Sequence, residues 1–520
     1  MRQTIHYNSG EKDMSMLLVT YDNKIYNIEC EKGTLLFEAL RKEGVAPASP
    51  CGGRGTCGKC AVFVTDASGT RKVLACRTYV DGDMNVTVPT DRGDVTWNET
   101  LPACEDYGAL APGREGLGLA VDLGTTTVAV KLYDLQSGKL LGTKSEWNAQ
   151  KDFGADVITR IQYCKDNADG LEVLSDEIRR QIRKMAGFLC MKKSREPGDI
   201  KEICICGNTV MQHIFAGLSP VSIASAPYEA LSLFDDGKSM NYVGAKTFLA
   251  PCVAGYVGGD ITSGLLSSGL WKKPGRNLFI DVGTNGEMAL GGRDGFVSCA
   301  VASGPAFEGA GIACGMQALD GAINKAKVED GKLVLEIVGG GKAKGICGSG
   351  LLDLISCLLK LGAVNKRGKF DPASDLVRGK GAEARVDLTE DGSVYLCQKD
   401  IRQLQLAKAA VAAGIKVLLA EEGLEVSELD GLYLAGGFGN RLDPVSAAEI
   451  GMLPMELVKP SDGSETKVRT VGNSALAGAE DALLDPSLRD RLIEIKDKCR
   501  YIELSTSSSF SEEFINELNF

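Results

Sequence analysis

The sequence predicts a multidomain protein that joins a small α+β domain to a larger α/β domain of two lobes. Its 520 residues are too many for one ordinary core. Four cysteines lie among short strand patterns near the N-terminus, and strand and helix patterns alternate after about residue 118. We therefore expect a tail at 1–14, a cysteine-bearing domain at 15–92, a linker at 93–116, and two lobes at 117–275 and 276–520.

Short apolar segments build the expected N-terminal domain. Two strands are predicted at 16–21 and 24–30 on either side of an Asp22-Asn23 turn. A short helix follows where Leu35, Leu36, Ala39 and Leu40 recur at helical spacing, and further strands are expected at 61–65, 72–75 and 84–88. This order suits a β-grasp domain.

The larger domain contains an internal repeat. Strands are expected at 119–122, 128–133 and 278–281, and a long helix at 171–190. The segments Asp122-Leu-Gly-Thr-Thr-Thr127 and Asp281-Val-Gly-Thr-Asn-Gly286 lie 159 positions apart, and each follows an apolar strand. The repetition predicts two related half-domains.

Composition limits the partners and the compartment. A net charge of -11 argues against nucleic-acid binding, which needs clustered Lys and Arg. The N-terminal residues lack the apolar core of a secretion signal, and the most apolar stretch, 406–420, contains Lys408 and Lys416. We therefore expect a cytoplasmic protein with no membrane partner. Its 17 cysteines are then not assumed to form disulfides, because cytosolic thiols are kept reduced.

Four of those cysteines are spaced as metal ligands. Cys51-x5-Cys57-x2-Cys60-x15-Cys76 provides three thiolates on one loop and a fourth on a following strand. The loop glycines 52, 53, 55 and 58 let the backbone wrap inorganic sulfide and direct N–H groups toward it. Zinc is the alternative, but it usually takes two short-spaced cysteine pairs. The remaining thirteen cysteines are expected to be small buried hydrophobes.

The motif PCGGRGTCGKC within a β-grasp pattern resembles the ferredoxins with a plant-type or adrenodoxin-type [2Fe-2S] cluster. The resemblance covers about residues 15 to 92. It implies one [2Fe-2S] cluster held by Cys51, Cys57, Cys60 and Cys76.

The repeated Asp-x-Gly-Thr turns predict a nucleotide site. Backbone N–H groups and hydroxyls there can hold phosphates, while the carboxylates approach Mg2+. With Leu434-Ala-Gly-Gly-Phe-Gly-Asn440, whose glycines let a turn lie flat against adenine, they resemble the acetate and sugar kinase, heat-shock chaperone and actin superfamily over about residues 117 to 485. The resemblance implies a two-lobed ribonuclease H-like (actin-like ATPase) domain that binds ATP with Mg2+ through Asp122, Gly124, Thr125, Thr126, Asp281, Gly283, Thr284, Gly436 and Gly437.

Hydrolysis of ATP would need a carboxylate that positions water near the γ-phosphate. Asp260, in Gly258-Gly259-Asp260 before the second phosphate turn, is the first candidate, and Glu308 is the second. Asp122 is the third catalytic candidate, because its carboxylate can approach the Mg2+ ion at the phosphates. A helix cap or a metal-orienting role explains Asp260 equally well.

The full order of motifs resembles the reductive activators of corrinoid-dependent methyltransferases. It comprises PCGGRGTCGKC, AVDLGTTTVAVKLYDL, FGADVITRI, IDVGTNGEMAL, ASGPAFEGAGI, GICGSGLLDLI and LAGGFGN. The resemblance implies ATP-dependent reduction of a Co(II) corrinoid to Co(I), a corrinoid protein as partner and an upstream low-potential electron donor. It leaves a homodimer open.

Two departures from the family limit this transfer. The segment between the cluster and ATP domains is short, so we expect a separate linker or middle domain of some members to be absent. Other activators hold [4Fe-4S] clusters near the C-terminus, but the last 120 residues contain only Cys499.

Two other functions remain open from the residues alone. The chain could be a small-molecule kinase with a redox-sensing ferredoxin domain and Asp260 as base. It could also be a non-catalytic switch that binds or releases a partner according to nucleotide and cluster state. Measured ATP turnover with and without a corrinoid protein separates the three.

Overall fold

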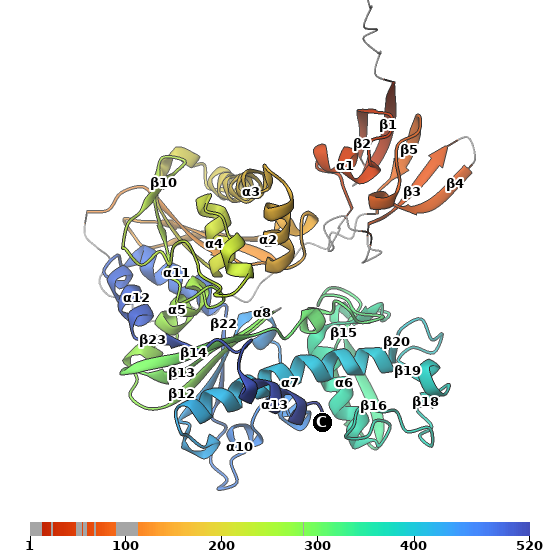
Figure 1. Ribbon diagram of the computed structural model, residues 1–520, viewed down its shortest axis with the longest axis vertical. Helices are drawn as coiled ribbons and strands as arrows, with labels where there is room; N and C mark the ends of the chain where they lie inside the picture. Colours follow the sequence, from red (N-terminus) through yellow and green to blue (C-terminus); the bar gives the residue numbers. More distant parts are fainter. Residues whose placement is uncertain are drawn as a thin grey trace, which may run out of the picture.

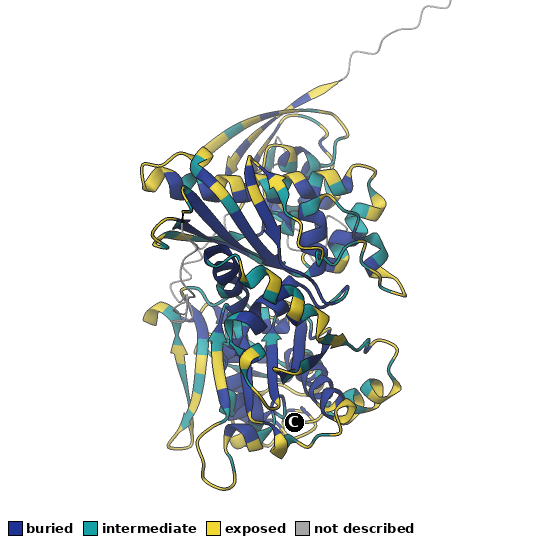
Figure 2. Cartoon of the chain, turned by 90° about the vertical axis from the view of Figure 1, so that its left-hand side faces the viewer, coloured by how far each residue is buried: buried dark blue, intermediate teal, exposed yellow. Residues whose placement is uncertain are grey.

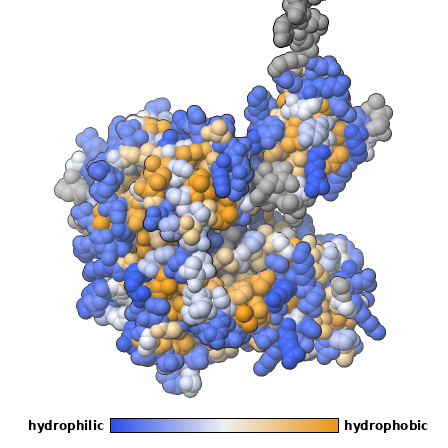
Figure 3. Space-filling model, in the orientation of Figure 1, coloured by the Kyte–Doolittle hydropathy of each residue, from blue (hydrophilic) through white to orange (hydrophobic). Residues whose placement is uncertain are grey.

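The protein is described by a computed structural model that covers residues 13–21, 24–47, 55, 60–66, 69–89, 113–283 and 285–520. A small N-terminal domain stands beside a larger two-lobed body (Figure 1). Figure 3 shows that the outline is hollowed between this domain and the part of the second lobe formed by residues 322–397.

The N-terminal domain is a five-stranded sheet in the order β2-β1-β5-β3-β4, covered on one face by a helix. Strands β1 and β5 are parallel, and the other neighbours are antiparallel. Alternation in β1 buries Leu17, Val19 and Tyr21 beneath α1, as a sheet with one covered face requires. The bounds are β1 Met14–Tyr21, β2 Lys24–Glu31, α1 Leu36–Lys42, β3 Ala61–Asp66, β4 Gly69–Leu74, η1 Ala75–Arg77 and β5 Met84–Thr87. The β-grasp prediction is confirmed.

The first lobe is a six-stranded mixed sheet in the order β10-β11-β9-β6-β7-β8. Its strands are β6 Leu117–Leu123, β7 Thr127–Asp134, β8 Leu140–Trp147, β9 Ile200–Gly207, β10 Met240–Tyr242 and β11 Ala245–Leu249. Its helices are α2 Val157–Asp166, α3 Gly170–Lys192, α4 Thr209–Ala216 and α5 Gly259–Ser267. β6 and β7 are almost entirely buried, as expected for central strands covered on both faces (Figure 2).

The second lobe repeats this plan in the order β22-β21-β12-β13-β14-β23. In each lobe a hairpin pair is antiparallel, and its first strand also pairs in parallel with a later strand, β9 for β6 and β21 for β12. The strands are β12 Asn277–Val282, β13 Gly286–Gly292, β14 Gly295–Val301, β21 Gly431–Ala435, β22 Val468–Gly472 and β23 Cys499–Tyr501. The motif echo therefore corresponds to a structural repeat.

Helices and two small sheets complete the second lobe. The helices are α6 Gly348–Lys360, α7 Gln398–Glu421, α8 Gly436–Gly439, α9 Pro444–Glu449, α10 Met455–Val458, α11 Ser474–Leu484, α12 Leu488–Asp497 and α13 Ser508–Asn516. The small sheets contain β15 Ala322–Glu329, β16 Lys332–Ile337 and β17 Gly345–Ile346, and β18 Val377–Arg378, β19 Arg385–Asp387 and β20 Tyr395–Cys397.

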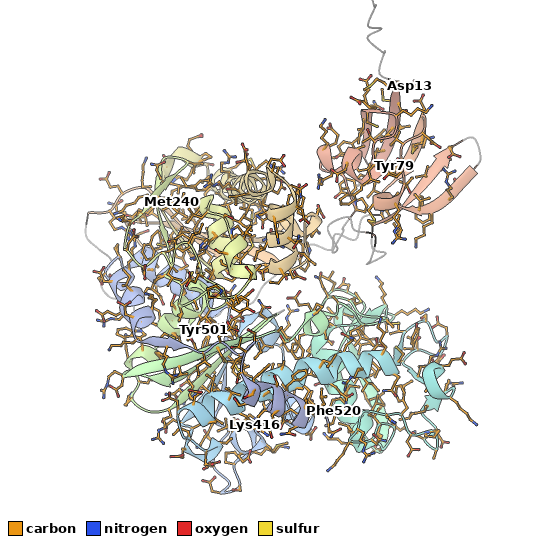
Figure 4. The ribbon with its side chains drawn as sticks, in the orientation of Figure 1. Asp13, Tyr79, Met240, Lys416, Tyr501 and Phe520 are labelled. Atoms are coloured by element: carbon orange, nitrogen blue, oxygen red, sulfur yellow. The ribbon has the colours of Figure 1, made fainter. Side chains whose placement is uncertain are left out.

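The helix α7 is largely buried in the second lobe and contacts the C-terminal segment. Among the described residues, α7 is the one helix long and apolar enough to cross a membrane, but 78% of its most apolar window is buried inside the protein. Lys416 on α7 pairs with Glu513 on α13 at 3.0 Å, and Phe520 donates its backbone N–H to the Lys366 carbonyl (Figure 4). α7 is therefore a core helix.

The two lobes meet at the crossing of α5 and α11. A Cβ atom on Gly478 would lie 2.2 Å from the Ser263 carbonyl oxygen, so only glycine allows this approach. Both helices join a core that also takes residues from β6, β9, β12 and β21. The cavity described next lies at this junction.

Candidate functional site

Two of the predicted cluster ligands lie together in the N-terminal domain. Cys60 precedes β3 and Cys76 is in η1, and both side chains are buried. Their Sγ atoms are 3.1 Å apart, too far for a bond of about 2.05 Å between them and close enough to serve one metal centre. Cys51 and Cys57 lie outside the described residues. The expectation that Cys76 is on a strand is wrong, because the chain turns into η1 directly after β4.

The described part of the cysteine loop shows why glycine is needed there. Gly55 has φ +73°, in the left-handed region, and a Cβ atom on it would lie 2.3 Å from Nε of Arg77. A larger residue would displace the Arg77 guanidinium that follows Cys76. The close passage of backbone and a neighbouring cation fits a negatively charged cluster at this position.

The first phosphate turn joins β6 to β7 and is held from several sides. Asn148 donates to the Gly124 carbonyl at 2.8 Å, and Asn208 donates to Oγ1 of Thr125 at 2.9 Å. A Cβ atom on Gly124 would lie 2.6 Å from the Thr127 carbonyl oxygen. The turn is thus preorganised, with Gly124, Thr125 and Thr126 lining a cavity of about 310 Å³.

The second phosphate turn faces the same cavity from β12 and β13. The Gly283 N–H donates to the Asn285 carbonyl at 2.8 Å, and Ser303 donates to the Gly283 carbonyl at 3.1 Å. Thr284 lies outside the described residues. Asp281 and Gly283 line the cavity opposite the first turn.

Besides Glu308, four carboxylates line this cavity: Asp122, Asp260, Asp281 and Glu287. Burial raises the pKa of Asp122 to about 6, although a 2.7 Å hydrogen bond from Asn473 opposes the shift. Burial and the charge of Asp122 raise the pKa of Asp260 to about 7. Burial, with repulsion from Asp260 and Asp122, also raises the pKa of Asp281 to about 7.

Glu287 was not predicted from the sequence. It is buried on β13, and burial, followed by the charges of Asp260 and Asp281, raises its pKa well above the usual value. Oxygen donors crowded against like charges are the donor set that a divalent cation stabilises. Among the described residues, no three such side chains are placed to hold one ion together, so the carboxylates fit Mg2+ that keeps several waters and is bound through one or two of them.

The predicted adenosine turn closes the cavity. Gly436, Gly437 and Phe438 line it, and the Phe438 ring stacks on Phe307 with centroids 4.7 Å apart and an interplanar angle of 19°. A Cβ atom on Gly436 would lie 2.3 Å from Oδ1 of Asp281. The backbone of this turn thus reaches the carboxylate group.

Glu308, the second catalytic candidate, spans the cleft. It ends the 3₁₀ turn η6 (Pro305–Glu308) of the second lobe and accepts from the Thr126 hydroxyl of the first lobe at 3.1 and 3.2 Å. Asp260 lies in the first turn of α5, where its Oδ1 accepts from the Ile261 N–H at 2.9 Å. Both candidates and Asp122 line one cavity.

Arg160 was missed as a site residue although its motif, FGADVITRI, was noted. Its guanidinium is buried on α2 and donates to the Thr125 carbonyl at 2.6 Å. Burial lowers its pKa to about 9, and the charges of Asp156 and Glu308 oppose that shift. Arg160 thus stabilises the first phosphate turn by donating to its backbone carbonyl.

These features define a class: an iron–sulfur protein of the ferredoxin type fused to an actin-type ATPase. Domain matches agree, with the 2Fe-2S iron-sulfur cluster binding domain at 19–81, the RACo middle region at 117–273 and the C-terminal ASKHA domain of RACo at 276–520. The chain belongs to the RACo family, the reductive activators of corrinoid proteins.

Individual relatives are similar over most of their length. The corrinoid activation enzyme RamQ of Eubacterium limosum is 30% identical, with 95% of this chain and 97% of the relative covered. The [Co(II) methylated amine-specific corrinoid protein] reductase of Methanosarcina barkeri is 26% identical over 78% of this chain and 77% of its own. A solved reductive activator for a corrinoid, iron-sulfur protein is 30% identical, covers 97% of this chain and 98% of its own, and has a TM-score of 0.68.

One expectation is corrected by these matches. The short segment before residue 117 led us to expect no separate middle domain, yet the family's middle region matches 117–273. The first lobe itself is that region.

Proposed function

We propose that this protein uses ATP to return a corrinoid protein from the Co(II) to the Co(I) state. Its relatives are named for corrinoid activation and for reduction of a Co(II) corrinoid protein, and the similarity to RamQ and to the solved activator extends over nearly the whole chain. The observation that carries the proposal is that a buried cysteine pair of a ferredoxin-type domain and a carboxylate-lined nucleotide cavity occur in one chain.

The energetic logic is that of an uphill transfer of one electron. Plant-type clusters lie near roughly -400 mV, and each further 100 mV of demand costs about 2.3 kcal/mol per electron. A [2Fe-2S] cluster held by the cysteines would supply the one electron that converts Co(II) to Co(I). Hydrolysis of ATP to ADP and phosphate would offset the cost by favouring a complex in which the cobalt is easier to reduce.

The proposed roles follow the geometry. Asp122 and Asp281 would hold Mg2+, and Asp260 would orient the attacking water. Glu308 holds the Thr126 hydroxyl across the cleft. The cluster ligands are Cys51, Cys57, Cys60 and Cys76, and the phosphate and adenosine turns contribute Gly124, Thr125, Thr126, Gly283, Thr284, Gly436 and Gly437.

The proposal extends to the surroundings of the protein. A low-potential donor reduces the cluster, and the site of action is the cytoplasm. The functional units are the cluster domain at 15–92, the linker at 93–116, and the lobes at 117–275 and 276–520.

An anaerobic assay of corrinoid absorbance tests the function. The protein, ATP, a low-potential reductant and a Co(II) corrinoid protein are mixed, and formation of Co(I) is followed. Cys76→Ser should abolish reduction together with the cluster's visible absorbance. Cys30→Ser, a half-buried thiol on β2 outside the motif, should change neither.

A second variant isolates the nucleotide requirement. Asp122→Ala should keep the cluster spectrum and lose ATP-dependent reduction. Reduction that proceeds equally without ATP, or a purified protein without iron, would exclude the proposed function. If the rate of ATP turnover does not depend on the corrinoid protein but rises with an added small molecule that carries a hydroxyl group, the result would favour the alternative function, a small-molecule kinase.

A further inference from the structure

Arg41 of the cluster domain contacts the first lobe. Arg41, in the last turn of α1, places its Cζ atom 5.0 Å from the ring centroid of Phe153 and 5.9 Å from that of Tyr163. These two rings pack edge to face with centroids 5.1 Å apart. Both distances are within the range of cation–π attraction, so the aromatic pair is a docking surface for α1.

An ion pair on α1 holds Arg41 in the orientation of this contact. Glu38, three residues earlier on α1, pairs with Arg41 and orients it. Burial raises the pKa of Tyr163, and the positive charge of Arg41 opposes the shift, as expected for a cation that faces the ring and its hydroxyl. Figure 1 shows α1 on the side of the N-terminal domain that faces α2.

The docking surface belongs to the segment that supports the phosphate turn. Tyr163 lies on α2 three residues after Arg160, a separation of about 4.5 Å along the helix axis. Besides the Thr125 carbonyl, Arg160 donates to the carbonyl of Gly154, the residue after Phe153, at 3.0 Å. One buried side chain therefore links the nucleotide turn to the backbone beneath both aromatic rings.

This linkage is stiff. A Cβ atom on Gly154 would lie 2.6 Å from Oγ1 of Thr159 and 2.9 Å from the backbone nitrogen of Arg160. The chain before α2 therefore packs directly on the first turn of that helix. Asp156 caps α2 by accepting from the Thr159 N–H at 2.7 Å, and the Thr159 hydroxyl accepts from the Asp156 N–H at 3.2 Å. A shift of Thr125 must therefore move α2 as a body or break the bonds of Arg160.

We propose that α2 couples nucleotide binding to the docking of the cluster domain. Without nucleotide, Arg160 holds Thr125 and keeps Phe153 and Tyr163 in place for Arg41. Phosphates bound in the cavity draw the first phosphate turn away from α2, which disturbs the aromatic pair and releases the cluster domain. This goes beyond the proposed function, because it states how the two chemistries of the chain communicate and does not depend on the identity of the partner.

Hydrogen exchange of the full anaerobic protein tests the docking surface. Arg41→Glu should weaken docking roughly tenfold and raise amide exchange in α1 and in residues 153–163. Lys42→Glu makes the same charge change on the next, exposed residue and should behave as the wild type. Phe153→Leu keeps an apolar side chain without the aromatic face, so it should reproduce Arg41→Glu from the other side of the contact.

Nucleotide titration tests the coupling. In the wild type, a non-hydrolysable ATP analogue with Mg2+ should raise exchange in both segments, and in Arg41→Glu it should add nothing in α1. Arg160→Lys keeps the charge but loses the forked donor to the Thr125 and Gly154 carbonyls, so exchange in residues 153–163 should already be high without nucleotide and the analogue should add little to it. Cluster absorbance and measured nucleotide affinity identify variants that fail to fold.

Two results overturn the proposal. If exchange in residues 153–163 is the same in Arg41→Glu and Lys42→Glu, the docking surface is not used. If docking exists but the analogue leaves wild-type exchange unchanged or lowers it, α2 does not release the domain.

Discussion

Replacing Asp281 by asparagine should stabilise the metal-free protein while removing its response to Mg2+. In the fold, Asp281 is crowded by Asp260 and Asp122, and burial with this repulsion raises its pKa from 3.8 to about 7. The folded protein therefore holds a proton here that the unfolded chain releases. Stability from this group is present below about pH 4 and is lost as the pH rises toward 7.

The magnitude follows from the shift. About three pKa units at 1.36 kcal/mol each give a cost of roughly 4 kcal/mol for ionised Asp281 at pH 8. Of this, about 2.5 kcal/mol develops between pH 5 and pH 8, since the unfolded carboxyl is already mostly ionised at pH 5. For a lobe of this size, that corresponds to a decrease of roughly 5–10 °C in Tm, which an uncharged Asn side chain avoids.

Thermal melts followed by circular dichroism, on EDTA-treated protein between pH 5 and pH 8, measure the effect. Asp281→Asn should melt above the wild type at pH 8, with a difference that shrinks toward pH 5. Mg2+ with ATP should raise the Tm of the wild type only. The control is Asp294→Asn, a carboxylate of the same lobe with 90% of its side chain exposed. Parallel melting curves for Asp281→Asn and wild type across this pH range would refute the reasoning.

The remaining predictions concern turnover and nucleotide affinity. Asp260→Asn should lower ATP turnover by about 10²- to 10⁴-fold at unchanged nucleotide affinity, because it removes the group that orients water; equal losses in affinity would assign it to metal binding. Glu308→Gln keeps an acceptor for the Thr126 hydroxyl and should lower steady-state turnover by less than about tenfold; a loss as large as that of Asp260→Asn would make Glu308 the catalytic group. Gly436→Ala should weaken ATP binding by at least about tenfold in calorimetry, because its Cβ atom would clash with Asp281, whereas Gly423→Ala, also at positive φ but with no atom nearby, should leave affinity unchanged.

Patterns of neighbouring residues were sufficient to predict the first strand of the cluster domain and the two strands that end in the phosphate turns. The alternation at 16–21 predicted β1 within two residues, because one face of that strand is buried and the other is exposed. Asp122 and Asp281 were placed correctly at the ends of apolar strands, since the Gly-Thr turn after each strand is a property of consecutive residues.

The sequence could not predict contacts between distant segments. Glu308 was a candidate, but its contact with Thr126 across 182 positions was not predicted, and neither was the contact of Asn473 with Asp122 across 351. Glu287 sits on an apolar strand, where alternation alone gives no reason for a buried carboxylate. Arg160 appears in the sequence as one polar residue of an amphipathic helix, and only the fold shows that its side chain points inward to the phosphate turn.

The separation of the two chemistries constrains how ATP can assist electron transfer. Within the described part of the chain, the residues that line the nucleotide cavity all come from the two lobes, and none comes from the cluster domain. Nucleotide charge therefore acts on the cluster across at least one folded boundary, where solvent and counterions weaken it over about 10 Å. A mechanical route through Arg160 and α2 is not screened in this way. ATP would then control where the cluster domain can go, and the potential of the cluster would stay nearly constant between nucleotide states.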